Sequence, residues 1–506
     1  MSSRTIAGSE EPADQREQIS ALARQRAEEY LQTGNRSAVI RAVAGYRLLV
    51  LSATNDEDRV EALSGLSASR QLLFGSRGLR SDIDDAIERG TAVLAMLDPT
   101  RPRTRHHANL GNAYRLRFEE VSSDRADLRA GLQHAWDALD DEAAPHVHAQ
   151  RLSNFGLLLR LHFEALGRRD DIDESVEVIE EAVELADAAQ RPQILSNAST
   201  SRRIRGARYG IAEDLHESRR LSNRALRSRE TPEHLRVGLL INAALPDLDL
   251  FHLTDIAAHL KRAELALELA LKLVDHGSPD HLIVLINLAN LKRLLASADP
   301  APGRSDEAVE VALAALAALP VRHPDRPRFL AAVGRALRTR LNLEGRAEDA
   351  RDSVRYRSQA ADYDGGDPYE RALSAYTAGL WASEDNEHDT ALHYLLTALD
   401  LLPKVVWLGL DRTTVLAHTV EWQDLARDVA ASAIQNDELP VAIAALERGR
   451  TMFWSQVTGY PDESTRLRNA HPGLGDHLDR LDRISEQLAA ARAAANEKIS
   501  ASRANS

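Results

Sequence analysis

The sequence predicts an all-α protein, a right-handed α-solenoid of about nine helical hairpins with a period of roughly 45 residues. The chain has 506 residues, whereas a single compact domain rarely exceeds about 250–300 residues. Related segments return at a nearly constant spacing along much of this length. Alternating β-branched runs bounded by Asn-Gly turns, the usual sign of strands, are nearly absent. These three observations favour an open array of helices.

The repeat is clearest in a series of equivalent asparagines. Three segments read Asn-Leu-Gly-Asn-Ala-Tyr-Arg-Leu-Arg-Phe from Asn109, Asn-Phe-Gly-Leu-Leu-Leu-Arg-Leu-His-Phe from Asn154 and Asn-Leu-Ala-Asn-Leu-Lys-Arg-Leu-Leu from Asn287. Asn197 and Asn242 complete the series, with spacings of 45, 43, 45 and 45 residues. Chance seldom holds a period over so many steps, so the chain is interpreted as a tandem repeat.

Each repeat unit reads as two helices. In the first helix apolar residues recur at helical spacing, as at Leu152, Phe155, Leu159 and Phe163. The second helix begins with carboxylates, as in residues 81–85, 170–174 and 304–307, and negative charge suits that end of the helix dipole. Prolines between units open the next helix without removing an interior hydrogen bond; they are Pro102, Pro145, Pro192, Pro232, Pro279, Pro324 and Pro368.

Hairpins of this kind are expected to stack, because a lone hairpin leaves one apolar face in water. Small residues such as Gly111 and Gly156 would let neighbouring helices approach closely. The unit resembles a tetratricopeptide repeat (TPR), since Leu110-Gly111 followed by Tyr114 matches the Leu-Gly-x-x-Tyr part of that pattern. It exceeds the ~34-residue norm, which predicts a longer turn between its helices, and HEAT-type units of ~40–47 residues are the alternative.

Composition excludes several classes of site. The formal net charge is −14, aromatic residues make up 4% and there is no cysteine, so disulfides, thiolate metal sites and a cysteine nucleophile are excluded. The acidic balance disfavours broad nucleic-acid binding but leaves room for a local basic patch. The N-terminus has no apolar core typical of a secretory signal, and no stretch reads as the ~20 apolar residues that cross a bilayer. We therefore expect a cytoplasmic protein with no membrane partner.

Four segments are expected: a disordered N-terminus over 1–18, the TPR-like solenoid over 19–410, a terminal repeat with capping helices over 411–458, and a helical linker or tail over 459–506. The third includes a long helix from roughly residue 413 to 435. Near its end stand Ala-Leu-Glu-Arg-Gly-Arg at 445–450 and Trp-Ser-Gln at 454–456, followed by residues 467–472, Leu-Arg-Asn-Ala-His-Pro.

These motifs and the degenerate repeat units resemble the repeat region of TPR–CHAT proteins, in which a caspase-like CHAT protease domain follows the repeats. The resemblance implies a sensor or scaffold module that receives a partner and regulates a CHAT protease in cis or in trans. Caspase-like chemistry needs a cysteine nucleophile, which this chain lacks. The CHAT domain itself is therefore absent from this sequence, and we expect a non-enzymatic chain.

The sharpest charge anomaly lies in one repeat. Between residues 202 and 229 there are nine arginines and three acids. Arg202, Arg203, Arg205 and Arg208 are candidates for binding an acidic peptide, because the planar guanidinium favours bidentate contact with carboxylate or phosphate. The alternative function is a regulator that binds nucleic acid or phosphate through the same repeat. The structural interpretation is ion pairing with residues 170–187, which carry nine acids and no base.

Two other sets of residues have a functional and a structural interpretation. The asparagine series could clamp the main chain of an extended peptide, since amides both donate and accept, or bond the next repeat. Arg448, Arg450 and Trp454 could dock a downstream domain or cap the last repeat.

No metal, cofactor or catalytic site is predicted. The 18 histidines show no recognised ligand spacing, and there is no phosphate loop, nucleophile elbow or dinucleotide motif. The sequence thus predicts a non-enzymatic scaffold that binds a protein or peptide.

Overall fold

The structure is a computed structural model that describes residues 12–98, 100–122, 124–139, 143–405 and 422–458. No strand occurs within these ranges, which contain twenty α-helices. A π-helical turn, η1, covers Phe118–Ser122, and a 3-10 turn, η2, covers Glu233–Leu235. The α-helices are α1 Pro12–Thr33, α2 Arg36–Leu51, α3 Asp56–Arg77, α4 Arg80–Met96, α5 Thr104–Arg117, α6 Arg125–Asp137, α7 Pro145–Leu166, α8 Arg169–Leu185, α9 Arg191–Tyr209, α10 Ala212–Arg227, α11 Arg236–Thr254, α12 Ala257–Leu273, α13 Pro279–Ala298, α14 Arg304–Ala318, α15 Arg326–Glu344, α16 Ala347–Asp362, α17 Pro368–Glu384, α18 His388–Val405, α20 Leu425–Gln435 and α21 Leu439–Thr458.

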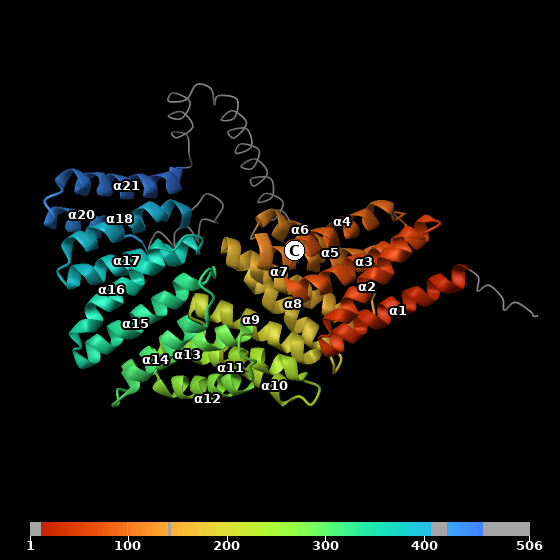
Figure 1. Cartoon of the computed structure of the whole chain (residues 1–506), viewed down its shortest axis with the longest axis horizontal. Coiled ribbons are helices and arrows are strands. Elements are labelled where there is room, and N and C mark those ends of the chain that lie inside the picture. Colours follow the sequence, from red (N-terminus) through yellow and green to blue (C-terminus); the bar gives the residue numbers. More distant parts are fainter. Residues whose placement is uncertain (1–11, 99, 123, 140–142, 406–421, 459–506) are drawn as a thin grey trace, which may run out of the picture.

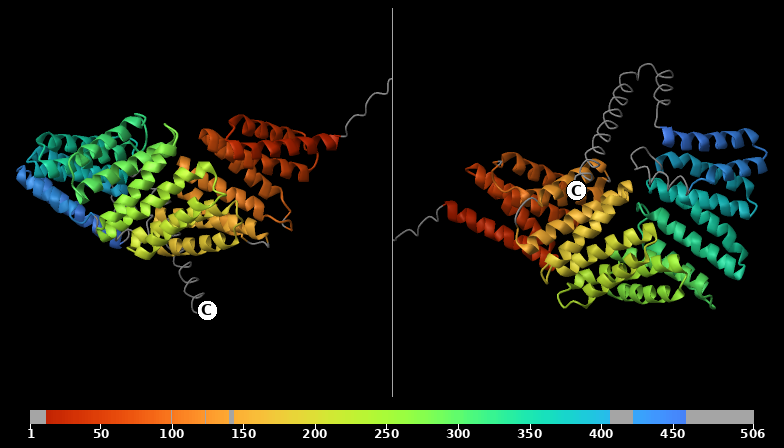
Figure 2. Two further views of the ribbon diagram at one scale, coloured as in Figure 1. Left: turned by 90° about the horizontal axis from the view of Figure 1, so that it is seen from below. Right: turned by 180° about the vertical axis from the view of Figure 1, so that it is seen from behind.

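The helices form an α-solenoid, which confirms the predicted fold class. Consecutive helices pack as antiparallel pairs, from α1 with α2 to α20 with α21, and the described residues contain ten such pairs where about nine were expected. The pairs follow one another along a curved array that begins at α1, passes α10–α12 at its middle and reaches α21 at the other end (Figure 1). Figure 2 shows the same curvature from two further directions.

The array has an inner and an outer layer. The first helices of successive pairs contact one another, as α9 contacts α11 and α13 contacts α15, whereas no comparable contact joins successive second helices in the described part of the chain. In a curved array the more closely spaced layer is the concave one. The first helices, α3 to α17 by odd numbers, therefore form the inner layer, and the second helices form the outer layer.

The predicted longer turn inside each unit is wrong. Six pairs are joined by only two residues, and the first of these has positive φ at Gly34, Gly78, Gly167, Gly210, Asp255 and Gly345. A left-handed residue closes a helix within one turn, which is why glycine recurs there. The extra length lies in the helices, since α7 has 22 residues and α8 has 17.

A buried contact between a basic side chain and an aspartate closes five of the pairs. The third residue of the second helix is a buried aspartate, and a basic side chain near the end of the first helix donates to it. In the fourth pair His162 Nδ1 lies 2.7 Å from Asp171 Oδ2. The complete set is Arg77 with Asp82, Arg117 with Asp127, His162 with Asp171, Arg205 with Asp214 and Arg340 with Asp349. The carboxylates predicted to open the second helices thus also bind the first helices.

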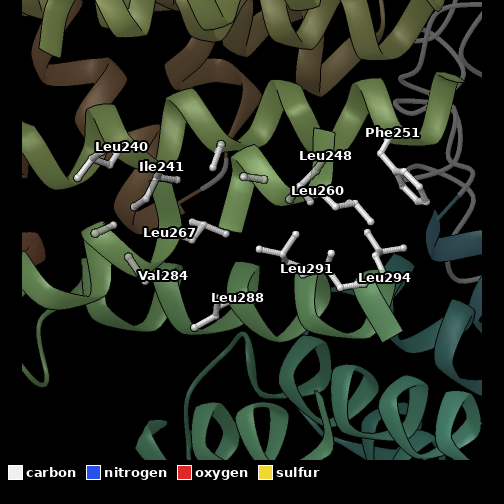
Figure 3. Close-up of a cluster of buried hydrophobic side chains, with 14 of the residues drawn as sticks. Leu240, Ile241, Leu248, Phe251, Leu260, Leu267, Val284, Leu288, Leu291 and Leu294 are labelled. Atoms are coloured by element: carbon white, nitrogen blue, oxygen red, sulfur yellow. The ribbon is translucent and has the colours of Figure 1, made fainter. Parts of the chain in front are cut away.

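The apolar core is continuous from pair to pair. Figure 3 shows one cluster, in which Leu240, Leu248 and Phe251 of α11 meet Leu260 and Leu267 of α12 and, beyond the pair, side chains of the next helix. The contributors from α13 are Val284, Leu288, Leu291, Leu294 and Leu295. Because α13 opens the following pair, the core of each pair is completed by its neighbour.

Glycines let the helices of a pair approach, as predicted. A Cβ added at Gly111 of α5 would lie 3.1 Å from the backbone nitrogen of Ala135 in α6, and one at Gly156 of α7 would lie 2.3 Å from Ile179 Cγ1. At Gly75, in the last turn of α3, a Cβ would meet no atom within 4 Å. Of these three glycines, packing requires Gly111 and Gly156 but not Gly75.

Three expectations from the sequence can be compared with the structure at α1, α13 and α20. Helix α1 begins at Pro12, inside the range 1–18 for which disorder is expected. Helix α13 is long and apolar enough to cross a membrane by composition, but 61% of its apolar window is buried among the neighbouring helices. The long helix expected over 413–435 is represented by α20, from Leu425, and residues 422–424 form a turn before it. Residues 413–421, residues 467–472 and the tail from 459 onward lie outside the described residues.

Replacing Gly111 with alanine should destabilise the protein, because the new methyl group would press against the backbone of α6. We expect a loss of about 1–3 kcal/mol in the free energy of unfolding, the usual cost of overpacking. Gly75→Ala is the matched control, and it should raise stability by about 0.5–1 kcal/mol through helix propensity. Urea denaturation measures both changes, and equal effects would contradict the close approach of α5 and α6.

The buried aspartates should make stability fall in acid. Burial alone would raise the pKa of Asp214, but hydrogen bonds and charge from Arg205 and Arg202 lower it below its ordinary value of 3.8. The folded pKa is then below the unfolded one, so the stabilisation is complete above 3.8 and is lost as the pH falls through the folded value. Asp214→Ala should cost about 3 kcal/mol at pH 7 and weaken this pH dependence.

Glu213 provides the control, since it is an exposed carboxylate beside Asp214 in the first turn of α10. Glu213→Ala should change the free energy of unfolding by no more than about 0.5 kcal/mol. Denaturation curves collected between pH 7 and about pH 3 test both variants. A loss in Glu213→Ala as large as in Asp214→Ala would show that the buried pair has no special role.

Candidate functional site

Two members of the asparagine series bond the preceding inner helix. Asn197 Nδ2 of α9 donates to Ser153 Oγ of α7 at 3.0 Å. Asn242 Nδ2 of α11 donates to Ser196 Oγ of α9 at 3.0 Å and approaches Thr200 Oγ1 at 3.4 Å. At these two positions the amide therefore links successive repeats.

The other three asparagines bond differently. Asn154 Oδ1 accepts from Gln150 of its own helix at 3.1 Å, and Asn287 Nδ2 donates to the Ile283 carbonyl at 2.8 Å. Asn109 offers its backbone carbonyl to Gln71 Nε2 at 3.2 Å. The five residues share a position in the repeat, but the structure does not bring them together into one ladder. Their proposed role as a peptide clamp stays a prediction.

We call residues 202–229 the basic repeat. Three of its four candidate arginines form ion pairs within the chain. Arg202 Nε donates to Glu180 Oε1 of α8 at 2.7 Å. Arg205 makes two hydrogen bonds to Asp214, at 2.7 and 2.9 Å, and Arg203 Nη1 lies 3.1 Å from Asp249 Oδ2. The partners lie on α8, α10 and α11. The contacts of Arg202 with Glu180 and of Arg205 with Asp173 favour the structural interpretation, pairing with residues 170–187. Arg203 pairs with the following repeat instead.

The groove beside these residues has mixed charge. It has a volume of about 1130 Å³ and is lined mainly by α8 and α10 of the outer layer, with five glutamates and four arginines. Such a lining gives little net potential for an anion. Arg208 is exposed on α9, and no ion pair or hydrogen bond is recorded for it within the described ranges. It is the one member of the four with its charge free.

The C-terminal motif lies on α21, in the last described pair, and contacts the preceding pair. Arg448 of α21 makes an ion pair with Asp400 of α18, with Nη2 2.7 Å from Oδ1. Arg450 pairs within its own helix with Glu447. Trp454 belongs to α21, but its side chain lies outside the described residues. The contact of Arg448 suits a capping role, and docking of a further domain stays a prediction.

Sequence reasoning missed a cluster of three arginines farther along the array. Arg293 lies on α13, Arg335 on α15 and Arg357 on α16. Two of these helices, α13 and α15, belong to the inner layer, and Arg293 and Arg335 are partly exposed there. Arg357 is buried, at 3% exposure, and reaches toward α17, where its Nη1 lies 3.3 Å from Ser374 Oγ. We call Arg293, Arg335 and Arg357 the arginine cluster.

The arginine cluster lacks carboxylate partners. No ion pair is recorded for its three members among the described residues, and the buried Nε atoms of Arg293 and Arg357 have no hydrogen-bond partner. The neighbouring Arg338 is different, because its guanidinium binds Asp385 Oδ2 at 2.9 Å. Glu370 is the carboxylate whose charge reaches Arg335 and Arg357, but it forms no ion pair with them in the described part of the chain.

The cluster is held under electrostatic strain. Burial and, to a smaller extent, the charge of Arg335 together lower the pKa of Arg357 to about 9 and that of Arg293 to about 10. Burial also lowers the pKa of Arg335. All three guanidinium groups nevertheless stay protonated at neutral pH. An anion placed beside them would therefore relieve both desolvation and mutual repulsion.

A signal for this site exists in the sequence. Residues 326–344, which form α15, contain five arginines and a single acid. That bias resembles the one in the basic repeat, but it does not reveal which arginines find partners on neighbouring helices. Arg340 binds Asp349 and Asp306, whereas Arg335 on the same helix binds neither.

Replacing Asn197 with alanine should destabilise the array, because Ser153 would lose its partner across the repeat boundary. We expect a loss of about 1 kcal/mol in the free energy of unfolding. Asn154→Ala is the matched control, since among the described residues Asn154 bonds Gln150 of its own helix and not a neighbouring repeat. It should change stability by less than about 0.5 kcal/mol. Chemical denaturation measures both, and equal losses would contradict the bridging role of Asn197.

Comparisons with known proteins give no family. No family model matches the chain, and no curated protein matches it. Among solved structures, human IFIT1 dimer with PPP-AAAA has a TM-score of 0.46 and 15% identity, covering 87% of this chain and 86% of that chain. Rap protein complexed with competence and sporulation factor has a TM-score of 0.36 and 13% identity, covering 83% and 99%. BtubC from P. vanneervenii scores 0.24 at 15% identity, covering 63% and 95%. No score among these reaches 0.5, so the fold assignment rests on this chain's own helices.

Proposed function

We propose that this chain is a binding scaffold whose inner surface takes up an acidic segment of a partner protein at the arginine cluster. The observation that carries the proposal is that Arg293, Arg335 and Arg357 stand together without ion pairs, while most neighbouring arginines are paired. A carboxylate can accept two parallel hydrogen bonds from one guanidinium. An Asp- or Glu-rich segment therefore supplies what the cluster lacks.

The three arginines have different parts in this binding. Arg335 and Arg293 are accessible on the inner layer and contact the carboxylates. Arg357 lies beneath them, against the ring of Trp381 at 5.3 Å from its centroid. Its buried charge raises the local positive potential without touching the partner.

A protein segment fits this site better than a nucleic acid. The whole chain has a net charge of −14, which repels a long polyanion at a distance. Nucleic-acid binding relies on many phosphate contacts spread along a backbone, whereas the cluster offers three charges in one place. The basic repeat adds little, since Arg202, Arg203 and Arg205 are paired internally.

We infer from the sequence resemblance that the scaffold works with a CHAT protease. Two observations support this inference. The motif at 445–456 resembles the end of that repeat region, and Arg448 of α21 makes an ion pair with Asp400 of α18, so that α21 packs against the preceding repeat. Adding the purified chain to such a protease should change its rate of peptide cleavage. An unchanged rate, with and without an acidic peptide, would contradict this part of the proposal alone.

Arg335→Gln should weaken binding of an acidic peptide without loss of stability. The probe is fluorescein-labelled hexaglutamate, followed by fluorescence anisotropy. Loss of a charged hydrogen bond costs about 1.5–3 kcal/mol, so we expect the dissociation constant to rise by about 10-fold or more. The melting temperature should stay equal or rise, because the substitution removes repulsion from Arg293 and Arg357.

Arg208→Gln is the matched control, since Arg208 is exposed and free of recorded ion pairs within the described ranges. This variant should bind hexaglutamate like the unaltered chain. Hexaglutamine should not bind either protein. Loss of binding in Arg208→Gln alone would move the site to the basic repeat, and tighter binding of a short single-stranded DNA than of hexaglutamate would favour the nucleic-acid alternative.

A further inference from the structure

Three potential metal ligands converge between α5 and α6. His107 of α5 faces His134 of α6, with their Nδ1 atoms 2.9 Å apart. Asp137, one turn after His134, places Oδ2 3.5 Å from His107 Nδ1. These ligand atoms all lie within 4.8 Å of one another. The two histidines are 27 residues apart in sequence, which is why ligand spacing along the chain gave no sign of them.

The separations match the edges of a small coordination polyhedron. Ligands about 2.0–2.1 Å from a tetrahedral zinc ion lie roughly 3.3 Å apart, between the two distances seen here. A hydrogen bond between the imidazoles is the other explanation of the short contact, but it leaves Asp137 without a role at His107. A central cation satisfies all three groups at once.

The neighbouring residues hold the ligands in place. Gln133 Nε2 donates to Asp137 Oδ1 at 2.8 Å, which leaves Oδ2 directed at His107. The ring of Tyr114 stacks on His134 with centroids 5.7 Å apart. Second contacts of this kind orient ligands in metal sites.

The site is accessible from solvent. The side chain of His107 is 16% exposed and that of Asp137 is 34% exposed. An ion can therefore enter without opening the helix pair, and a water molecule can complete the coordination. Two imidazoles and one carboxylate are ligands that zinc accepts readily, whereas calcium and magnesium prefer oxygen alone.

We propose that His107, His134 and Asp137 bind one divalent transition-metal ion of the zinc class, with water as a fourth ligand. The site ties the end of α6 to α5 and so stabilises the third helix pair. It is independent of the arginine cluster, which lies on α13, α15 and α16. The two proposals can therefore fail separately.

The test is zinc binding to the full chain after treatment with a chelator, measured by isothermal titration calorimetry. We expect one equivalent of Zn²⁺ to bind and to raise the melting temperature. His134→Ala should abolish this binding. Asp137→Asn, which keeps the shape and the contact with Gln133, should weaken it by at least about 10-fold. Co²⁺ at the same site should give the visible absorption of a tetrahedral complex.

His106→Ala provides the matched control. His106 is the neighbour of His107 on α5 and is also partly buried, but its Nδ1 lies 3.3 Å from Ser64 Oγ of α3. This variant should retain one equivalent of Zn²⁺. Binding that survives His134→Ala and Asp137→Asn would assign the metal to other histidines and overturn the proposal, as would the absence of any Zn²⁺ binding by the folded, unaltered chain.

Discussion

The structure depends on one constraint, that no helix pair has enough apolar partners to fold by itself. Leu260 and Leu267 of α12 are fully buried only because α11 covers one side and α13, from the next pair, covers the other. Full burial of such a side chain stabilises the fold by about 1.5–3 kcal/mol. Each pair therefore depends on its neighbours, and the chain grows as a curved array with a long inner surface.

The features that repeat could be predicted from the sequence, because packing imposes the same demand on every pair. The asparagine period gave the unit, and Gly111 and Gly156 gave the close approaches. The turn was predicted wrongly because chain length alone does not say whether added residues extend a loop or a helix. The left-handed residues Gly78, Gly167 and Gly210 carried that information, since glycine is the usual residue that stops a helix there.

The candidate site could not be predicted, because it depends on which charges remain unpaired. Counting residues identified the arginines from 202 onward, yet the fold supplies Glu180 and Asp214 to Arg202. Arg335 lies on a helix of similar composition, but Arg293 and Arg357 of neighbouring helices lie within reach of its charge. Glu370, the acid whose charge reaches it, forms no ion pair with it among the described residues. Composition fixes the number of charges in a repeat, whereas the neighbouring repeats fix their partners.

Paired and unpaired arginines have different roles in this fold. In five helix pairs a basic residue of the first helix contacts a buried aspartate of the second, as Arg340 contacts Asp349. These charges stabilise the helix pair and are not available to bind a ligand. Repulsion at the arginine cluster costs stability instead, and the fold tolerates it because the apolar core on either side is continuous. Each pair of the array is stabilised by contacts with its own neighbours. Repulsion between charges at one binding surface therefore does not destabilise the other pairs. This is why we expect neutralising Arg335 to affect affinity and stability in opposite directions.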